Sequence, residues 1–236
     1  MPGFLVELAD TRGDEARSLY LPPHLPPAEL EKSLKEIPAE QDIANRLTEF
    51  ASRSTTGSVI FWSPGHTCLV LPPFPITEKH LASSLATELL HSLLKHDYMI
   101  ALILVRLGSY AIGVCRGEKL VSSKVGTGLV HGRHKKGGSS AHRFERHRDK
   151  QIEYFLTRVC QRAREQLEPH MKSLDYTVYG GAWTTIQLLQ KQCPFVGKLD
   201  KPALPPLLDI PEPRQAVLEK AVSRVWSSTV MEWRED

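Results

Sequence analysis

Residues 98–106 restrict the possible folds of this chain most, because a strand formed by them would be apolar on both faces. Such a strand needs cover above and below, so it belongs in the middle of a sheet that carries helices on both sides. Further strand patterns follow at 110–116, at 119–124, briefly near 129–130, and again at 175–179. Their alternation with helical patterns predicts an α/β fold, a mixed sheet with helices on both faces.

Apolar residues at helical spacing mark the remaining elements. The predicted helices cover 27–54 with a break at Pro38, 77–96, 140–168, 182–192 and 214–233. In the second of these, the leucines are expected to face the core (Leu81, Leu85, Leu89, Leu90, Leu93, Leu94). Two short strands around the turn Ser63-Pro64-Gly65 predict a hairpin.

These patterns suggest three parts for the chain. Residues 1–56 are expected to be a helical extension that packs on the core, residues 57–193 the α/β domain, and residues 194–236 a proline-rich segment with a last helix. The longest apolar run has eight residues, whereas a membrane helix needs about twenty. The N-terminus has acids and no apolar signal-peptide core. We therefore expect a soluble, cytoplasmic protein without membrane contact.

The four cysteines, Cys68, Cys115, Cys160 and Cys193, form neither a CxxC pair nor a metal knuckle. A chain of this length and composition rarely depends on disulfides. We expect no disulfide framework and no metal site.

Positive charge is concentrated in residues 131–150, which read HGRHKKGGSSAHRFERHRDK. Seven Lys and Arg against two acids give this segment +5, whereas the whole chain carries only +3. Such a cluster is typical of proteins that bind a phosphate backbone. The alternative is a solvated helix face that serves solubility.

Two adjacent glycines, Gly137 and Gly138, stand inside this cluster just before the predicted long helix. Glycines let a backbone approach a ligand closely, and a helix N-terminus attracts anions. The loop therefore suits insertion into a phosphate-rich cleft. It is not a P-loop, because GxxxxGK[ST] is absent.

The run from Gly132 to Arg146, GRHKKGGSSAHRFER, resembles the central domain of eukaryotic and archaeal class-I peptide release factors. That family combines a basic run, Gly-Gly-Gln, Ser-Ala-x-Arg-Phe and a long helix. A weaker resemblance in element order covers residues 57–181. The short chain and the stretch LVLPPFPITEKH look like the Vms-like release factors of actinobacteria and chloroflexi.

The resemblance implies an RNase-H-like sheet and codon-independent hydrolysis of peptidyl-tRNA in ribosome rescue and quality control. It implies catalytic roles for Gly137, Gly138 and Ser139, and the position of His142 just after them makes it a further catalytic candidate. The implied RNA-binding residues are Arg133, His134, Lys135, Lys136, Arg143 and Arg146. The implied partners are large-subunit rRNA and peptidyl-tRNA, bound by a monomer without cofactor or metal.

Ser139 stands where the release factors have glutamine, and Ser140, Ala141 and His142 follow it. Serine keeps the backbone N–H that stabilises developing charge and loses the side-chain amide. Losing one positioned group typically costs about 10²–10³ in rate. Slow hydrolysis and a non-catalytic ribosome- or tRNA-binding paralogue are both consistent with this residue.

Other interpretations remain for single residues. His142 would be a general base near the ester or a surface histidine that touches phosphate. Phe144 is expected to anchor the helix in the core, with base stacking as the alternative. A two-metal nuclease is disfavoured, because it needs clustered acids at strand ends, and two of the predicted strands end in Arg106 and Arg116.

Overall fold

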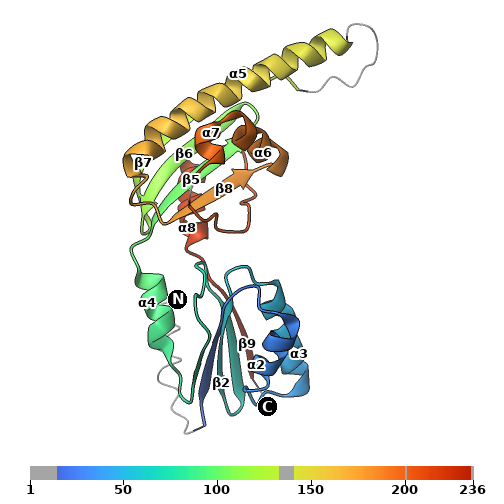
Figure 1. Ribbon diagram of the computed structural model, residues 1–236, viewed down its shortest axis with the longest axis vertical. Coiled ribbons are helices and arrows are strands. Elements are labelled where there is room, and N and C mark those ends of the chain that lie inside the picture. The colour runs from blue at the N-terminus through green and yellow to red at the C-terminus, as the bar shows by residue number, and fades with distance from the viewer. Residues whose placement is uncertain (1–14, 133–140, 200, 235–236) are drawn as a thin grey trace. The chain divides into compact units, whose positions relative to one another are not determined.

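The computed structural model describes residues 15–132, 141–199 and 201–234. The chain divides into two compact units (Figure 1). The described residues up to His96 form the first unit together with those from Trp226 onward, and Asp97–Val225 form the second. The basic segment and the long helix belong to the second unit, which therefore carries the candidate site.

The first unit is built on an antiparallel sheet with the strand order β4-β1-β2-β3-β9. Its strands are β1 (Arg17–Leu21), β2 (Ser58–Ser63), β3 (His66–Leu71), β4 (His80–Ala82) and β9 (Thr229–Arg234). Its helices are α2 (Pro27–Leu34), α3 (Gln41–Arg53) and α4 (Thr87–Lys95). Strands β2 and β3 form the predicted hairpin, with Gly65 at a positive φ of 74° in the turn.

Alternation along β1 places helices on both faces of this sheet. Leu19 and Leu21 are buried in one cluster with residues of α2 and α3. Tyr20, between them, is buried on the other face with Leu90 of α4. Its hydroxyl donates to the Ala86 carbonyl at 2.5 Å and accepts from the Leu90 N–H at 3.2 Å. Strand β1 is thus buried on both faces, and Tyr20 ties α4 to one of them.

The predicted helix over 77–96 is wrong in its first half. Residues 80–82 form the edge strand β4, in which Leu81 pairs with Leu19 of β1. Helix α4 begins only at Thr87. Of the six leucines expected in the core, Leu90 is fully buried, whereas Leu81 and Leu89 are exposed. Hydrogen bonding to the free edge of β1 satisfies the backbone of 80–82 and overrides the helical spacing.

The C-terminal helix is also shorter than predicted. Helix α8 (Gln215–Val225) ends nine residues before the end of β9 at Arg234, and β9 pairs with β3 over 229–234. A strand here caps the edge of the sheet in the first unit. Sequence spacing alone cannot show this, since the pairing partner lies more than 150 residues earlier in the chain.

The second unit contains a mixed sheet with the strand order β7-β6-β5-β8. The strands are β5 (Met99–Arg106), β6 (Ser109–Arg116), β7 (Lys119–Thr127) and β8 (Tyr176–Gly181). Strands β5 and β8 are parallel and the other pairs antiparallel. Strand β5 is central, and its residues 100–105 are fully buried. This confirms the prediction made from its apolar faces.

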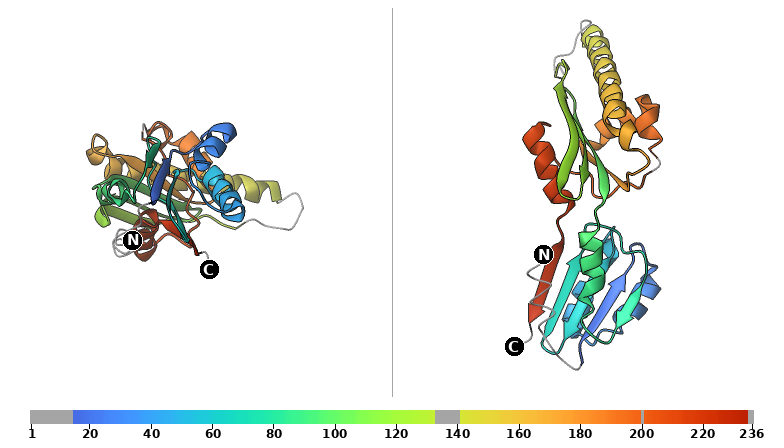
Figure 2. Two further views of the ribbon diagram at one scale, coloured as in Figure 1. Left: turned by 90° about the horizontal axis from the view of Figure 1, so that it is seen from below. Right: turned by 90° about the vertical axis from the view of Figure 1, so that its left-hand side faces the viewer.

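Helices cover both faces of this sheet, which confirms the predicted fold class (Figure 2). They are α5 (Ala141–Leu167), a 3-10 turn η1 (Glu168–His170), α6 (Trp183–Gln192), α7 (Pro194–Gly197) and α8. Residues of α5, α6 and α7 share one core with Ile103 and Ile112. Helix α8 packs on the opposite face, where Leu218 lies beside Gly113. Across the described ranges, no helix combines the length and apolarity needed to cross a bilayer.

The unit boundaries differ from the three predicted parts. Residues 57–96 belong with the N-terminal sheet, because β2 pairs with β1 along its length. Residues 15–56 are not a helical extension, since they contribute β1 to that sheet. Residues 194–225 belong with the second unit, to which α7 and α8 contribute. Strand pairing between distant segments decided the first two differences, and the packing of α7 and α8 decided the third.

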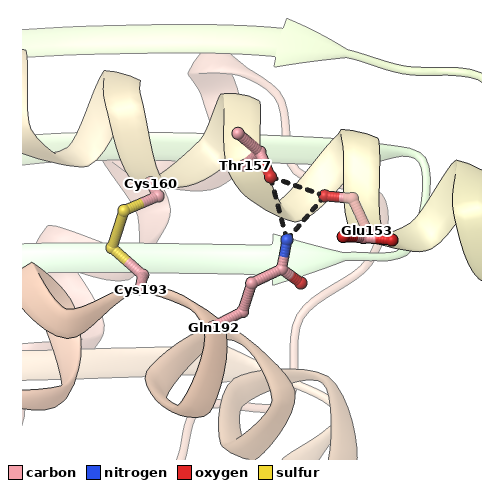
Figure 3. Close-up of a disulfide and its surroundings, with 5 residues drawn as sticks. All are labelled: Glu153, Thr157, Cys160, Gln192 and Cys193. Atoms are coloured by element: carbon pink, nitrogen blue, oxygen red, sulfur yellow. Dashed lines mark hydrogen bonds between the residues drawn. A yellow bond between two sulfur atoms is a disulfide. The ribbon is translucent and has the colours of Figure 1, made fainter.

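The expectation that the cysteines form no disulfide is wrong for one pair. Cys160 of α5 and Cys193 at the end of α6 are bonded, with their Cα atoms 5.4 Å apart (Figure 3). The Gln192 amide donates to the Glu153 carbonyl at 2.7 Å and to the Thr157 hydroxyl at 2.9 Å, which fastens α6 to α5 beside the bond. Packing of α6 on α5 brings together two cysteines that are 33 residues apart.

Reduction of this bond is expected to lower the free energy of unfolding. In the chain-entropy model, closing a loop of 33 residues lowers the entropy of the unfolded chain. This stabilises the folded state by about 3–4 kcal/mol. Urea unfolding followed by circular dichroism, with and without dithiothreitol, measures the change. Cys160→Ser is the control, and its midpoint should not respond to the reductant.

The two remaining cysteines do not complicate this test. Cys68 and Cys115 are buried and free. Burial raises the pKa of each thiol to about 12, so both stay protonated and poorly reactive near neutral pH. Equal midpoints for the oxidised and reduced protein would therefore contradict a stabilising role of the Cys160–Cys193 bond.

Candidate functional site

The N-terminal turns of α5 extend beyond the hydrophobic core. Phe155, Leu156 and Val159 are buried on the sheet, whereas every residue from 142 to 147 is exposed. The projecting part is visible at the end of α5 in Figure 1. The helix runs from Ala141 to Leu167, close to the predicted 140–168, and its basic start projects from the core as expected.

Two rows of side chains with different charge run along residues 143–158 of this helix. Glu145, Asp149 and Glu153 follow one another at a spacing of four residues. A second row at spacings of three and four contains Arg143, His147, Lys150, Tyr154 and Arg158. With 3.6 residues per turn, the two rows lie roughly 140° apart around the helix. The carboxylates therefore leave the basic row uncompensated, which favours an anionic partner.

The three predicted site residues on α5 all lie on its projecting turns. His142, Arg143 and Arg146 are exposed. The Nδ1 atom of His142 lies 4.0 Å from a carboxylate oxygen of Glu145, and Arg146 Nε donates to the His142 carbonyl at 3.4 Å. His142 is thus a surface histidine, and a role as general base remains a prediction. The guanidinium groups of the two arginines are available for phosphate.

The other predicted site residues lie outside the described residues. They are Arg133, His134, Lys135, Lys136, Gly137, Gly138 and Ser139.

The chain approaches that segment along α5. Arg158 donates to the Thr127 carbonyl at 3.0 Å, and Arg148 donates to the His131 carbonyl at 2.9 Å. The Gln151 side-chain oxygen accepts from the His131 N–H at 3.1 Å. Residues 127–131 are therefore held along a stretch of α5 that is about ten residues, or roughly 15 Å, long.

These contacts replace the short strand predicted near 129–130, which does not form. Close approach requires Gly128, since a Cβ there would lie 2.7 Å from Phe155 Cδ2. Gln151 has a structural role here.

Phe144 does not anchor the helix in the core, which corrects the prediction. Its side chain is 51% exposed. It sits on the projecting turns of α5, before the stretch from Phe155 onward that the helix buries in the core. The base-stacking alternative therefore stays open for this ring.

The ends of the central strands carry ion pairs. Arg116 Nε lies 2.7 Å from Asp97, and Arg106 lies 3.4 Å from Asp209. Both pairs are exposed, so each adds little to stability. Within the described part of the chain, no group of three or more His, Cys, Asp or Glu side chains is arranged to hold a metal ion.

The sequence analysis did not identify the second half of the basic row on α5, which lies nearer the core. Lys150, Tyr154 and Arg158 were not singled out, although they continue the spacing that begins at Arg143. A helical projection of 141–167 would have revealed the row. The role of Arg148 could not be found in this way, because its carbonyl partner lies on another segment.

Comparison with known proteins finds similarity to release factors. A family model described as Actinobacteria/chloroflexi VLRF1 release factor matches residues 98–231, more than half of the chain. Peptide chain release factor subunit 1 of Archaeoglobus fulgidus is 27% identical over 197 residues, which cover 72% of this chain and 48% of that protein. Peptide chain release factor subunit 1-1 of Methanosarcina acetivorans is 33% identical over 99 residues, 41% of this chain and 24% of that protein.

Among solved structures, the crystal structure of archaeal translation termination factor aRF1 aligns with a TM-score of 0.42 and 19% identity. That alignment covers 95% of this chain and 68% of the solved one. The chain spans about half the length of its curated relative from Archaeoglobus fulgidus.

Proposed function

The chain belongs to the Actinobacteria/chloroflexi VLRF1 release-factor family, and we propose that it is a peptidyl-tRNA hydrolase that frees nascent chains independently of the codon. Family membership supports a role in translation at the ribosome. One observation supports the finer proposal most strongly. In the sequence, the Gly137-Gly138 pair lies two residues before a helix whose first turns project from the core with a row of cations.

The proposed reaction is hydrolysis of the ester between the nascent peptide and tRNA. Water attacks the carbonyl carbon, the ester bond to the ribose oxygen breaks, and that oxygen leaves with a proton as a tRNA hydroxyl. The backbone N–H of Ser139 would donate to the developing oxyanion. Gly137 and Gly138 would allow the loop to approach the ester closely. The cations of the loop and of α5 would hold rRNA or the tRNA end. This reaction needs neither metal nor cofactor.

We further propose that the protein acts as a monomer on the large ribosomal subunit in ribosome rescue and quality control. Its substrate would be peptidyl-tRNA, and its place would be the cytoplasm, where translation occurs. Both Arg143 and Arg146 are exposed and one turn apart, so they can engage neighbouring phosphates bidentately.

A second function is favoured by one specific observation, the serine at position 139. A protein that keeps the basic surface and lacks the glutamine amide could bind ribosomes or tRNA without hydrolysis. Both proposals predict ribosome binding that weakens with salt, so binding does not separate them.

Single-turnover release separates them. Peptidyl-tRNA with a labelled nascent peptide would be loaded on purified large subunits, and release would be followed with and without the protein. Release above the spontaneous rate supports the hydrolase. A spontaneous rate at saturating, verified binding contradicts it and favours the non-catalytic paralogue.

Replacing both Arg143 and Arg146 by alanine is expected to weaken binding to large subunits and to flatten its salt dependence. Two lost phosphate contacts should reduce the slope of log K against log salt by about 1.4, at about 0.7 per phosphate of single-stranded RNA. Filter binding at several potassium concentrations gives the slope. Lys172→Ala/Lys191→Ala removes two exposed cations that do not belong to α5 and should leave the slope unchanged. Equal slopes for both double variants would contradict phosphate contacts at α5.

A further inference from the structure

A groove lies between α5 and the chain segment 128–132 that runs beside it. Its volume is about 300 Å³, at the lower end of the range of small-molecule sites. The described lining residues are Gly128, Leu129, His147, Lys150, Gln151, Tyr154, Phe155 and Arg158. Arg158, Arg148 and Gln151 fix the segment to the helix through hydrogen bonds to Thr127 and His131. The groove is therefore formed by elements that are tied to each other.

The walls of the groove expose apolar surface that a folded protein normally buries. Tyr154 is 81% exposed and Leu129 is 71% exposed, while Phe155 is buried against Gly128. Tyr154 stands one turn above Lys150 on α5. An exposed aromatic ring beside a small cavity offers a flat face on which a nucleobase can stack.

The charges around the groove have one sign. His147, Lys150 and Arg158 line it, and none of the described lining residues carries a carboxylate. Glu145, Asp149 and Glu153 lie in the other row of the helix, on the side where the Glu153 carbonyl accepts from Gln192 of α6 (Figure 3). A ligand with a flat apolar face and negative charge matches this combination, and a nucleotide has both features. An apolar peptide segment would leave the cations uncompensated.

We propose that this groove binds one unstacked nucleotide of RNA. Its base stacks on Tyr154 against Leu129, and its phosphate contacts Lys150, with His147 and Arg158 beside it. Because every base has a stacking face, the site should accept any of the four bases. The proposal rests on the proposed function only for the source of the nucleotide, which is either rRNA or tRNA.

The test compares Tyr154→Ala with Tyr154→Phe and with a matched control. Trp183 of α6 is also an exposed aromatic residue, and it does not line the groove. The probe is a fluorescein-labelled single-stranded hexaribonucleotide, followed by anisotropy. We expect Tyr154→Ala to weaken binding about 5- to 160-fold, the range of one lost base stack. Tyr154→Phe keeps the ring and should bind within about twofold of the parent, as should Trp183→Ala.

A second variant tests the phosphate contact. Lys150→Ala should reduce the salt slope for the same oligonucleotide by about 0.7, the contribution of one phosphate. Lys172→Ala, an exposed lysine outside the groove, should leave the slope unchanged. Large subunits and deacylated tRNA then serve as separate ligands. The ligand whose affinity depends on Tyr154 identifies the source of the nucleotide.

Two outcomes distinguish this proposal from the hydrolase proposal. If the parent releases no peptide but RNA affinity still depends on Tyr154, nucleotide binding in the groove is supported and the hydrolase proposal is contradicted. If the parent releases peptide while Tyr154→Ala binds oligonucleotide, large subunits and tRNA as the parent does, the groove is overturned. The latter result would also be expected if the groove accepts a protein segment. Because Tyr154 is largely exposed, its replacement leaves the core intact.

Discussion

Ser139→Gln is expected to accelerate peptide release by about 10²–10³, the usual contribution of one positioned polar group at a reacting centre. The variant restores the side-chain amide of the release-factor pattern and retains the backbone N–H proposed to stabilise the oxyanion. Single-turnover release on large subunits, at saturating factor, gives the rate. Because the substitution adds no charge, affinity for the subunit should stay the same.

Ser139→Ala is the matched control for this experiment. It removes the hydroxyl and adds no amide, so its release rate should equal that of the parent. A faster Ser139→Gln with a measurable parent rate would make this protein a slow hydrolase on a competent scaffold. No gain with glutamine would contradict the proposed placement of the loop at the ester and favour the non-catalytic paralogue.

Gly138→Ala is expected to reduce release by at least about 10² while affinity for the large subunit changes little. The added methyl group would stand between the loop backbone and the ester, and misplacing a reacting geometry by about 1 Å can cost about 10²-fold. The cations that bind RNA are unchanged. The comparison is best made in both the parent and the Ser139→Gln background, since the second provides the larger signal.

Gly132→Ala provides the control, because a Cβ at Gly132 would meet no atom of the described residues within 4 Å. It should release peptide at the parent rate. If Gly138→Ala released as fast as Gly132→Ala, the glycine pair would have no part in approaching the ester. Loss of ribosome binding by Gly138→Ala would instead show that the variant perturbs the RNA-binding surface.

Local patterns in the sequence determined much of the second unit. The apolar run of 98–106 is the central strand β5, because a strand without a polar face has no other place in a sheet. The long helix α5 agrees with its predicted bounds to within one residue at each end. Its exposed basic start also followed from the sequence, since the apolar spacing is interrupted there. These features depend on periodicity over neighbouring residues, which the chain displays directly.

The first unit could be predicted less well. Strands β1, β4 and β9 were missed, and β4 and β9 lie in segments whose spacing indicates helix. Each of them hydrogen-bonds to a strand from another part of the chain. For the edge strands β4 and β9, pairing depends on which backbone groups remain free after the rest of the sheet forms, so local sequence does not reveal it.

The sequence by itself determined the basic cluster, its glycine pair, Ser139 and the helix that follows them. The tertiary structure alone decided that Phe144 is exposed, that Cys160 meets Cys193, and that segment 128–132 runs along α5 to form a groove beside Tyr154. Residue types and spacing specify chemistry and local conformation. Contacts between segments distant in the chain arise only when helices and strands pack, because packing selects which faces meet.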